Sequence, residues 1–138
     1  MLPASDKKTT KPIQLMKKGD VFTATDRENH PHPIVFLEVS SEGKFNACIL
    51  STKPTQGNVK MSENYFLKQD AKGNEYTVMF NNSYLVPGRI FEKEDLWLSS
   101  MEPQGRLTEC GIKFVEEHTR GTNSEYHPVA IKRVYKSE

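Results

Sequence analysis

Cysteine is scarce in this chain, and the two cysteines present form no recognisable pattern. Cys48 and Cys110 stand far apart, without Cys-x-x-C spacing and without histidines clustered near them. A structural zinc site is therefore not expected, whereas a single disulfide is left open. Each cysteine lies within an apolar pattern, where free thiols usually behave as small buried hydrophobes. The simplest interpretation is a protein of a reducing, cytoplasmic compartment.

Long apolar runs and a strong net charge are also missing. Because no run reaches about 18 apolar residues, we expect no transmembrane helix and no membrane partner. The first residues, MLPASDKKTTKPIQLMKKG, contain lysines but lack the apolar centre that a secretory signal requires. The formal net charge is +1, so any anion-binding surface must come from local clustering of basic groups.

Several motifs of well-known enzyme classes do not occur. The sequence contains no G-x-S-x-G, Walker, G-x-G-x-x-G or H-E-x-x-H motif. Glu92, Glu94 and Asp95 gather three carboxylates, but no other residues complete a metal-ligand set. We therefore expect neither a bound metal nor a cofactor.

Short β-prone runs dominate what is present. At 138 residues, the chain is long enough for one domain with a substantial core. Runs rich in β-branched and aromatic residues are separated by Gly, Pro, Asn and Asp, which predicts strands joined by turns. The runs are 21–25, 34–37, 45–51, 59–61, 65–68, 76–80, 83–88 and 89–91. Because no helices alternate with them, they predict a mainly β fold, a small antiparallel barrel of five to seven strands.

One helix is expected near the end of the chain, from Thr108 as its N-cap to His118. Phe114 and Val115 belong to the stripe that would pack on the barrel. Gly111 argues against this helix, since glycine costs roughly 1 kcal/mol relative to alanine in a helix interior.

The chain divides into three expected parts. Residues 1–12 are polar and rich in lysine and threonine, as is typical of a flexible arm. Residues 13–121 would form the single barrel domain with its C-terminal helix. Residues 122–138 would be a tail or one last strand.

A polar loop between the first two expected strands concentrates reactive groups. Arg27 could clamp a phosphate through two hydrogen bonds, and His30 and His32 offer imidazoles for acid–base chemistry. The alternative is that His30-Pro31-His32-Pro33 is only a stiff linker, because a residue before proline is driven to extended geometry.

A second polar loop follows the strand at 45–51. Ser51, Thr52 and Lys53 could donate hydrogen bonds to the same phosphate if the two loops lie side by side, although such a sequence is more often a simple turn. Further along, Asn82 and Tyr84 could hold a splayed base, as in readers of single-stranded RNA, unless Tyr84 is a core residue.

The order of these pieces resembles the MazF/PemK family of toxin endoribonucleases. That family opens with Gly-Asp and a strand, here residues 19–22. A basic residue and Pro then lead into an apolar strand, here 32–37, and the next strand ends in a hydroxyl-rich loop, here 48–53. A Gly-Arg-Leu-Thr-like lead-in precedes the last helix, here 105–108. The resemblance spans roughly residues 17–118.

This resemblance implies an SH3-like barrel that acts as a homodimer and cleaves single-stranded RNA without metal, held in check by an antitoxin protein. The family usually carries Arg directly before the Pro, where this chain has His32, so the histidine would take that part. The implied catalytic residues are His32, Arg27 and Thr52. The implied RNA-binding residues are His30, Ser51, Lys53, Asn82 and Tyr84. The alternative is a non-catalytic SH3-like barrel that binds a protein or nucleic-acid partner.

Overall fold

The structure, a computed structural model, describes residues 16–25, 31–55, 57–100 and 102–126. Its strands are β1 (Asp20–Thr25), β2 (Pro31–Ser41), β3 (Lys44–Ser51), β4 (Val59–Lys60), β5 (Tyr84–Leu85), β6 (Ile90–Glu94), β7 (Gly105–Arg106) and β8 (Ser124–Tyr126). Its helical elements are η2 (Glu63–Tyr65), η3 (Asp95–Trp97) and α2 (Glu109–Thr119).

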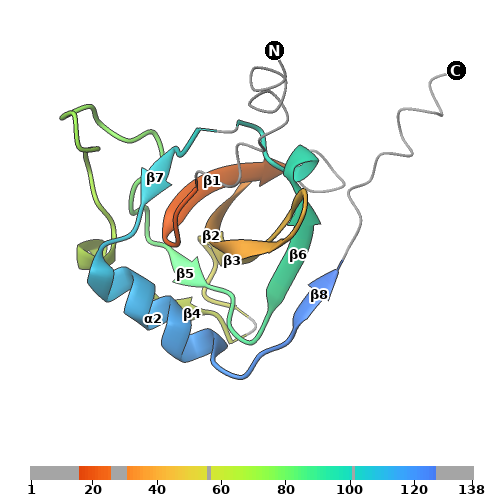
Figure 1. The fold of residues 1–138 in the computed structure, drawn as a ribbon. Helices are drawn as coiled ribbons and strands as arrows, with labels where there is room; N and C mark the ends of the chain where they lie inside the picture. The colour runs from red at the N-terminus through yellow and green to blue at the C-terminus, as the bar shows by residue number, and fades with distance from the viewer. Residues whose placement is uncertain (1–15, 26–30, 56, 101, 127–138) are drawn as a thin grey trace, which may run out of the picture.

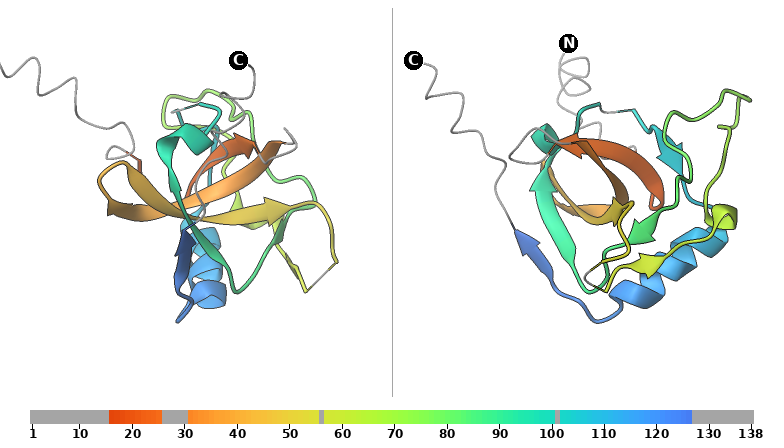
Figure 2. Two further views of the ribbon diagram at one scale, coloured as in Figure 1. Left: turned by 90° about the vertical axis from the view of Figure 1, so that its right-hand side faces the viewer. Right: turned by 180° about the vertical axis from the view of Figure 1, so that it is seen from behind.

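The strands form one curled sheet in the order β4-β5-β3-β2-β1-β7, with β6 pairing β3 and β8 (Figure 1). All neighbouring strands are antiparallel except β6 and β8, which run parallel. Figure 2 shows the strong curl of β1, β2 and β3, and α2 lying on the side of β4 and β5. The expected mainly β fold, a small barrel with one helix near its end, is confirmed.

The centre of strand β2 is buried on both faces, which explains its short continuous apolar run. Because successive side chains of a strand point to opposite faces, Ile34 and Phe36 enter one core and Val35 enters another. The first core consists of Met16, Phe22, Ala24, Ile34, Phe36, Phe45, Ala47, Trp97 and Leu98. The second consists of Val21, Val35, Cys48, Leu50, Met61, Phe66, Leu85, Leu107 and Val115.

Helix α2 begins at the expected cap. The Thr108 hydroxyl accepts a hydrogen bond from the Gly111 N–H at 3.2 Å, and Val115 inserts into the second core. Gly111 is a packing requirement of this helix. A Cβ built on Gly111 would lie 2.4 Å from the carbonyl oxygen of Tyr65, so only glycine lets the helix approach η2 this closely.

Residues 104–108, here called the bridging segment, hydrogen-bond to β1 along one edge. The Gln104 N–H donates to the Val21 carbonyl over 2.8 Å, and the Leu107 N–H donates to the Gly19 carbonyl over the same distance. These bonds extend the sheet beyond β1.

The other edge of the bridging segment holds the chain between β4 and β5. The Leu67 N–H donates to the Arg106 carbonyl at 2.9 Å, and the Val78 N–H donates to the Gln104 carbonyl at 2.7 Å. The bridging segment thus joins β1 to the chain that connects β4 with β5.

An ion pair fixes the bridging segment to the start of β1. Arg106 Nη1 lies 2.6 Å from Asp20 Oδ1, and the Lys17 N–H donates to Asp20 Oδ2 at 2.9 Å. The Asp20 side chain is only 9% exposed, so its charge depends on these two partners.

Two expected strands are wrong. Residues 65–68 and 76–80 form no strand. Within these described ranges, one isolated bridge occurs, between Phe66 and Leu107. The backbone groups of the two ranges bond to the bridging segment instead of to a continuous ladder. The described residues also contain eight strands, more than the expected five to seven. Three of the eight, β4, β5 and β7, are only two residues long.

None of the helices in the described ranges is long and apolar enough to cross a membrane.

Substitution of Gly111 by alanine should reverse the usual effect of that change in a helix. Alanine normally stabilises a helix interior by about 1 kcal/mol relative to glycine. Here the added methyl group must displace the Tyr65 carbonyl, and we expect Gly111→Ala to lower the free energy of unfolding by about 1–3 kcal/mol, the usual cost of overpacking. Urea denaturation measures this change in the free energy of unfolding, and Lys113→Ala, on the exposed face of α2, is the control. A Gly111→Ala protein as stable as the parent would contradict the close packing.

Candidate functional site

The end of β3 opens into a pocket of about 340 Å³, here called the β3-end pocket. Ser51 and Thr52 line it from the strand end, and Pro33 lines it from the start of β2. The loop before β5 forms the opposite wall. The described residues that line it are Pro33, Leu50, Ser51, Thr52, Phe66, Thr77, Val78, Met79, Phe80, Asn81 and Ser83.

Local hydrogen bonds fix the hydroxyl side of the pocket. Ser51 pairs with Tyr84 of β5, and its hydroxyl oxygen accepts from the Lys53 N–H at 3.0 Å. The Asn58 side-chain amide donates to the Lys53 carbonyl at 2.9 Å, which closes the loop. Because the Ser51 hydroxyl acts as an acceptor in this bond, a hydroxyl can also donate to a ligand, so the turn and a binding role are compatible.

The opposite wall is held just as closely. The Val78 N–H bonds to the bridging segment, and the buried Ser83 accepts from the Asn81 N–H at 3.2 Å. Between them, Asn82 has a φ of 50°, in the left-handed region that asparagine tolerates better than most residues. The Ser83 carbonyl accepts from the Met61 N–H at 3.0 Å, so both ends of this wall are attached to the fold.

The β3-end pocket combines aromatic surface with neutral polar groups. The rings of Phe66 and Phe80 lie 5.7 Å apart and are tilted by 56°. Hydroxyl and amide groups come from Ser51, Thr52 and Asn81, among others, and none of the lining residues in the described part of the chain is charged. Such a lining suits a planar, polar ring such as an unpaired nucleobase, which stacks on aromatic side chains and hydrogen-bonds at its edges.

Of the implied catalytic residues, only Thr52 lines the β3-end pocket. His32 is half-buried in β2 opposite Ala24 of β1. It directly precedes Pro33 but is not among the lining residues, as the alternation of side chains along a strand requires. Arg27 lies outside the described residues.

The implied RNA-binding residues are likewise divided. Ser51 lines the β3-end pocket, whereas Lys53 is exposed beside it and Tyr84 is half-buried without lining it. Asn82 is exposed at the tip of the turn that forms the opposite wall. His30 lies outside the described residues.

Sequence reasoning missed the aromatic floor of the pocket. Phe66 and Phe80 were expected in two strands, and nothing in the local sequence shows that their rings meet. The run Asn81-Asn82-Ser83 carries a turn signal, but its place beside Thr52 depends on contacts distant in the sequence.

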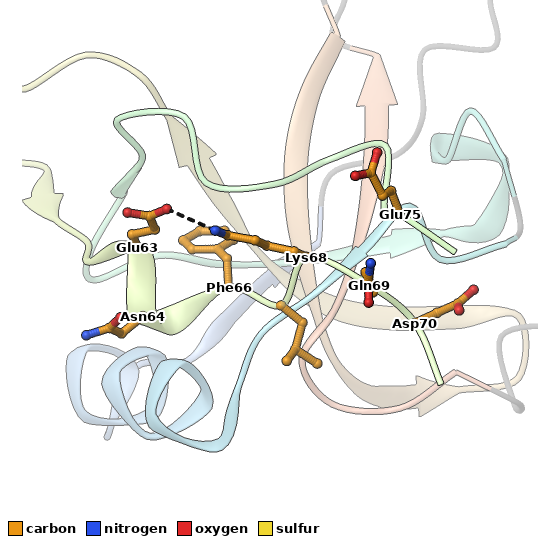
Figure 3. Close-up of a pocket in the computed structure, with 8 residues that line it drawn as sticks. Glu63, Asn64, Phe66, Lys68, Gln69, Asp70 and Glu75 are labelled. Atoms are coloured by element: carbon orange, nitrogen blue, oxygen red, sulfur yellow. Dashed lines mark ion pairs between the residues drawn. The ribbon is translucent and has the colours of Figure 1, made fainter. Parts of the chain in front are cut away.

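A second, wider hollow adjoins the β3-end pocket at Phe66 (Figure 3). The name acidic groove is used here for this hollow together with a smaller hollow that shares four of its lining residues. The main hollow has a volume of about 800 Å³. The groove is lined by Glu63, Asn64, Phe66, Leu67, Lys68, Gln69, Asp70, Glu75, Met79 and Phe80.

Negatively charged side chains outnumber positively charged ones along the acidic groove. Glu63 lies 3.6 Å from the Lys68 ammonium, and both side chains are well exposed. The Asp70 carboxylate accepts from the N–H groups of Lys72 and Asn74 at 2.8 and 2.9 Å. The Asn74 backbone bond, the main cause, lowers the pKa of Asp70. No set of three or more His, Cys, Asp or Glu side chains within the described ranges is arranged to hold a metal ion.

The two cysteines are free and differ sharply in environment. Cys48 is buried, and burial raises the pKa of its thiol to about 12, so it stays protonated and unreactive at neutral pH. Cys110 is exposed, because it precedes the buried Gly111 on α2 and faces away from the core. The two cysteines therefore form no disulfide with each other, which settles the alternative that the sequence left open, and the expected burial of Cys110 is wrong.

Comparison of the chain with protein-family models, with curated proteins and with solved structures gives no match. Function is therefore inferred from the sequence and from the geometry of the β3-end pocket.

Thiol labelling should distinguish the two cysteines. With Ellman's reagent at pH 8, we expect one reactive thiol in the folded protein and two in denaturant, because the Cys48 thiol is buried and has a pKa of about 12. The Cys110→Ser protein should show no fast-reacting thiol until it unfolds. Rapid labelling of folded Cys110→Ser would show that Cys48 is accessible and would contradict its buried position.

Proposed function

We propose that the chain is a metal-independent endoribonuclease of the MazF/PemK type that cleaves single-stranded RNA. One observation carries this proposal: the hydroxyl-rich end of β3 and the start of β2 meet at one pocket with an aromatic floor. These are two of the four chain segments that carry the sequence resemblance. In the proposal, an unpaired base occupies the β3-end pocket and its phosphate lies near Ser51 and Thr52.

Cleavage without metal requires three groups. A base removes the proton from the ribose 2′-hydroxyl, whose oxygen attacks phosphorus, and an acid gives a proton to the leaving 5′-oxygen. Hydrogen-bond donors stabilise the charge that develops on the phosphate oxygens. Thr52 supplies such a donor, and His32, which adjoins Pro33 at the rim, serves as base or acid. Arg27 is proposed as the phosphate clamp from its place in the sequence alone.

The partners follow from the same resemblance. We propose a homodimer that works in the cytoplasm and is restrained by an antitoxin protein. Two free cysteines support a reducing compartment, where disulfides seldom persist.

A second candidate function is a non-catalytic barrel that binds a protein or nucleic-acid partner. The observation in its favour is that none of the described residues lining the β3-end pocket has a titratable side chain. A pocket of this kind can hold a base without supplying an acid or base for chemistry.

Removal of single groups should separate turnover from folding. In a mixed RNA pool with EDTA, we expect Thr52→Val to slow cleavage about 10²- to 10³-fold, as for loss of one charge-stabilising donor. His32→Ala should slow it about 10²- to 10⁴-fold, as for loss of an acid–base group. Thr55→Val removes an exposed hydroxyl from the same loop and serves as the control. An uncut pool with wild-type protein, or equal cleavage by Thr52→Val, would defeat the proposal.

Binding measurements then distinguish the second candidate. Fluorescence anisotropy with a labelled single-stranded RNA oligonucleotide should show weaker binding by Phe80→Leu, because base–aromatic stacking contributes about 1–3 kcal/mol. Leu96→Ala, at an exposed apolar residue outside the pocket, is the control. Binding without cleavage would favour the non-catalytic barrel, and a Phe80→Leu protein that binds as well as the parent would exclude the pocket as the base site.

A further inference from the structure

Two large apolar side chains remain exposed along the acidic groove. Leu67 is 37% exposed and Met79 is 38% exposed. Leu67 lines the larger hollow of the groove and Met79 lines the smaller one, and Phe66 lines both hollows. Exposed apolar surface that lines a concavity, unlike isolated exposed residues, is typical of an interaction site.

The charges around this apolar surface favour a cationic occupant. Three carboxylates stand against one ammonium among the lining residues. Lys68 lies beside Glu63, which leaves Asp70 and Glu75 at the other side of the groove (Figure 3). A phosphate chain would be repelled there, whereas lysine and arginine form charge-assisted hydrogen bonds with carboxylates.

Shape and lining exclude a small cation as the main ligand. The hollow of about 800 Å³ is far larger than a single ion, and a bare ion would leave Leu67 and Met79 exposed. An extended peptide fits better, because alternate side chains can cover apolar surface and reach the carboxylates. Methionine adapts its shape to such a partner more readily than branched residues do.

We propose that the acidic groove docks an extended segment of another polypeptide, in which lysine or arginine residues flank apolar ones. Leu67 and Met79 contact the apolar residues, and Asp70 and Glu75 pair with the basic ones. This docking does not depend on RNA cleavage. The groove shares Phe66, Met79 and Phe80 with the β3-end pocket, so the docked segment lies beside the proposed base site.

The test uses a fluorescein-labelled nine-residue peptide in which lysine and leucine alternate. A peptide with alternating glutamate and leucine is its counterpart. Anisotropy titrations with the full chain should show binding of the lysine peptide only, weakened by added salt because the charge pairs are exposed. Glu75→Lys should weaken binding roughly 3- to 10-fold, since one exposed ion pair is lost and a like charge is added. Met79→Ala should weaken binding of the lysine peptide at high salt as well, because the apolar contact dominates there.

The matched control is Glu42→Lys, which makes the same charge change in the turn between β2 and β3, outside the groove lining. The proposal is overturned if neither peptide binds, if both bind equally, or if Glu42→Lys weakens binding as much as Glu75→Lys. Self-association of the protein that Glu75→Lys abolishes would also overturn it, with a second copy of the chain as the occupant. Because the titrations contain no RNA, their outcome is independent of whether the chain cleaves RNA.

Discussion

The bridging segment at residues 104–108 holds the rest of the structure in place because it forms hydrogen bonds along both edges. One edge extends the curled sheet beyond β1, and the other fixes the chain between β4 and β5. Buried backbone groups must find partners, and this chain has few ladder bonds of its own. Without the bridging segment, the walls of the β3-end pocket and the acidic groove would lose the hydrogen bonds that Leu67 and Val78 make to it.

Two glycines set how closely those walls approach the sheet. A Cβ on Gly105 would lie 2.4 Å from the Val78 carbonyl oxygen, and one on Gly111 would lie 2.4 Å from the Tyr65 carbonyl oxygen. The two contacts lie on either side of Phe66 in the sequence and hold the aromatic floor against the second core. The shape of the pocket therefore depends on residues that do not line it.

The sequence predicted what local patterns encode and missed what distant contacts decide. Strands β1 to β3 carry runs rich in β-branched and aromatic residues, and Thr108 is a clear helix cap, so these elements were found. Residues 65–68 and 76–80 have strand-like sequences, yet their backbone partners are the bridging segment rather than a ladder. Ser51 and Thr52 were identified by their hydroxyls, whereas the ring pair of Phe66 and Phe80 depends on tertiary packing and left no local signal.

The two hollows that meet at Phe66 differ in charge, and under the proposed function this difference would give a bound RNA a direction. The β3-end pocket is lined by neutral groups and has the exposed Lys53 beside it, whereas the acidic groove has an excess of carboxylates. Charges interact over about 8 Å at physiological ionic strength, so a phosphate next to an occupied pocket is repelled from the side of Asp70 and Glu75. A strand whose base enters the β3-end pocket would therefore leave along the β2 and β3 ends, toward His32, and the acidic groove would remain open for a cationic partner.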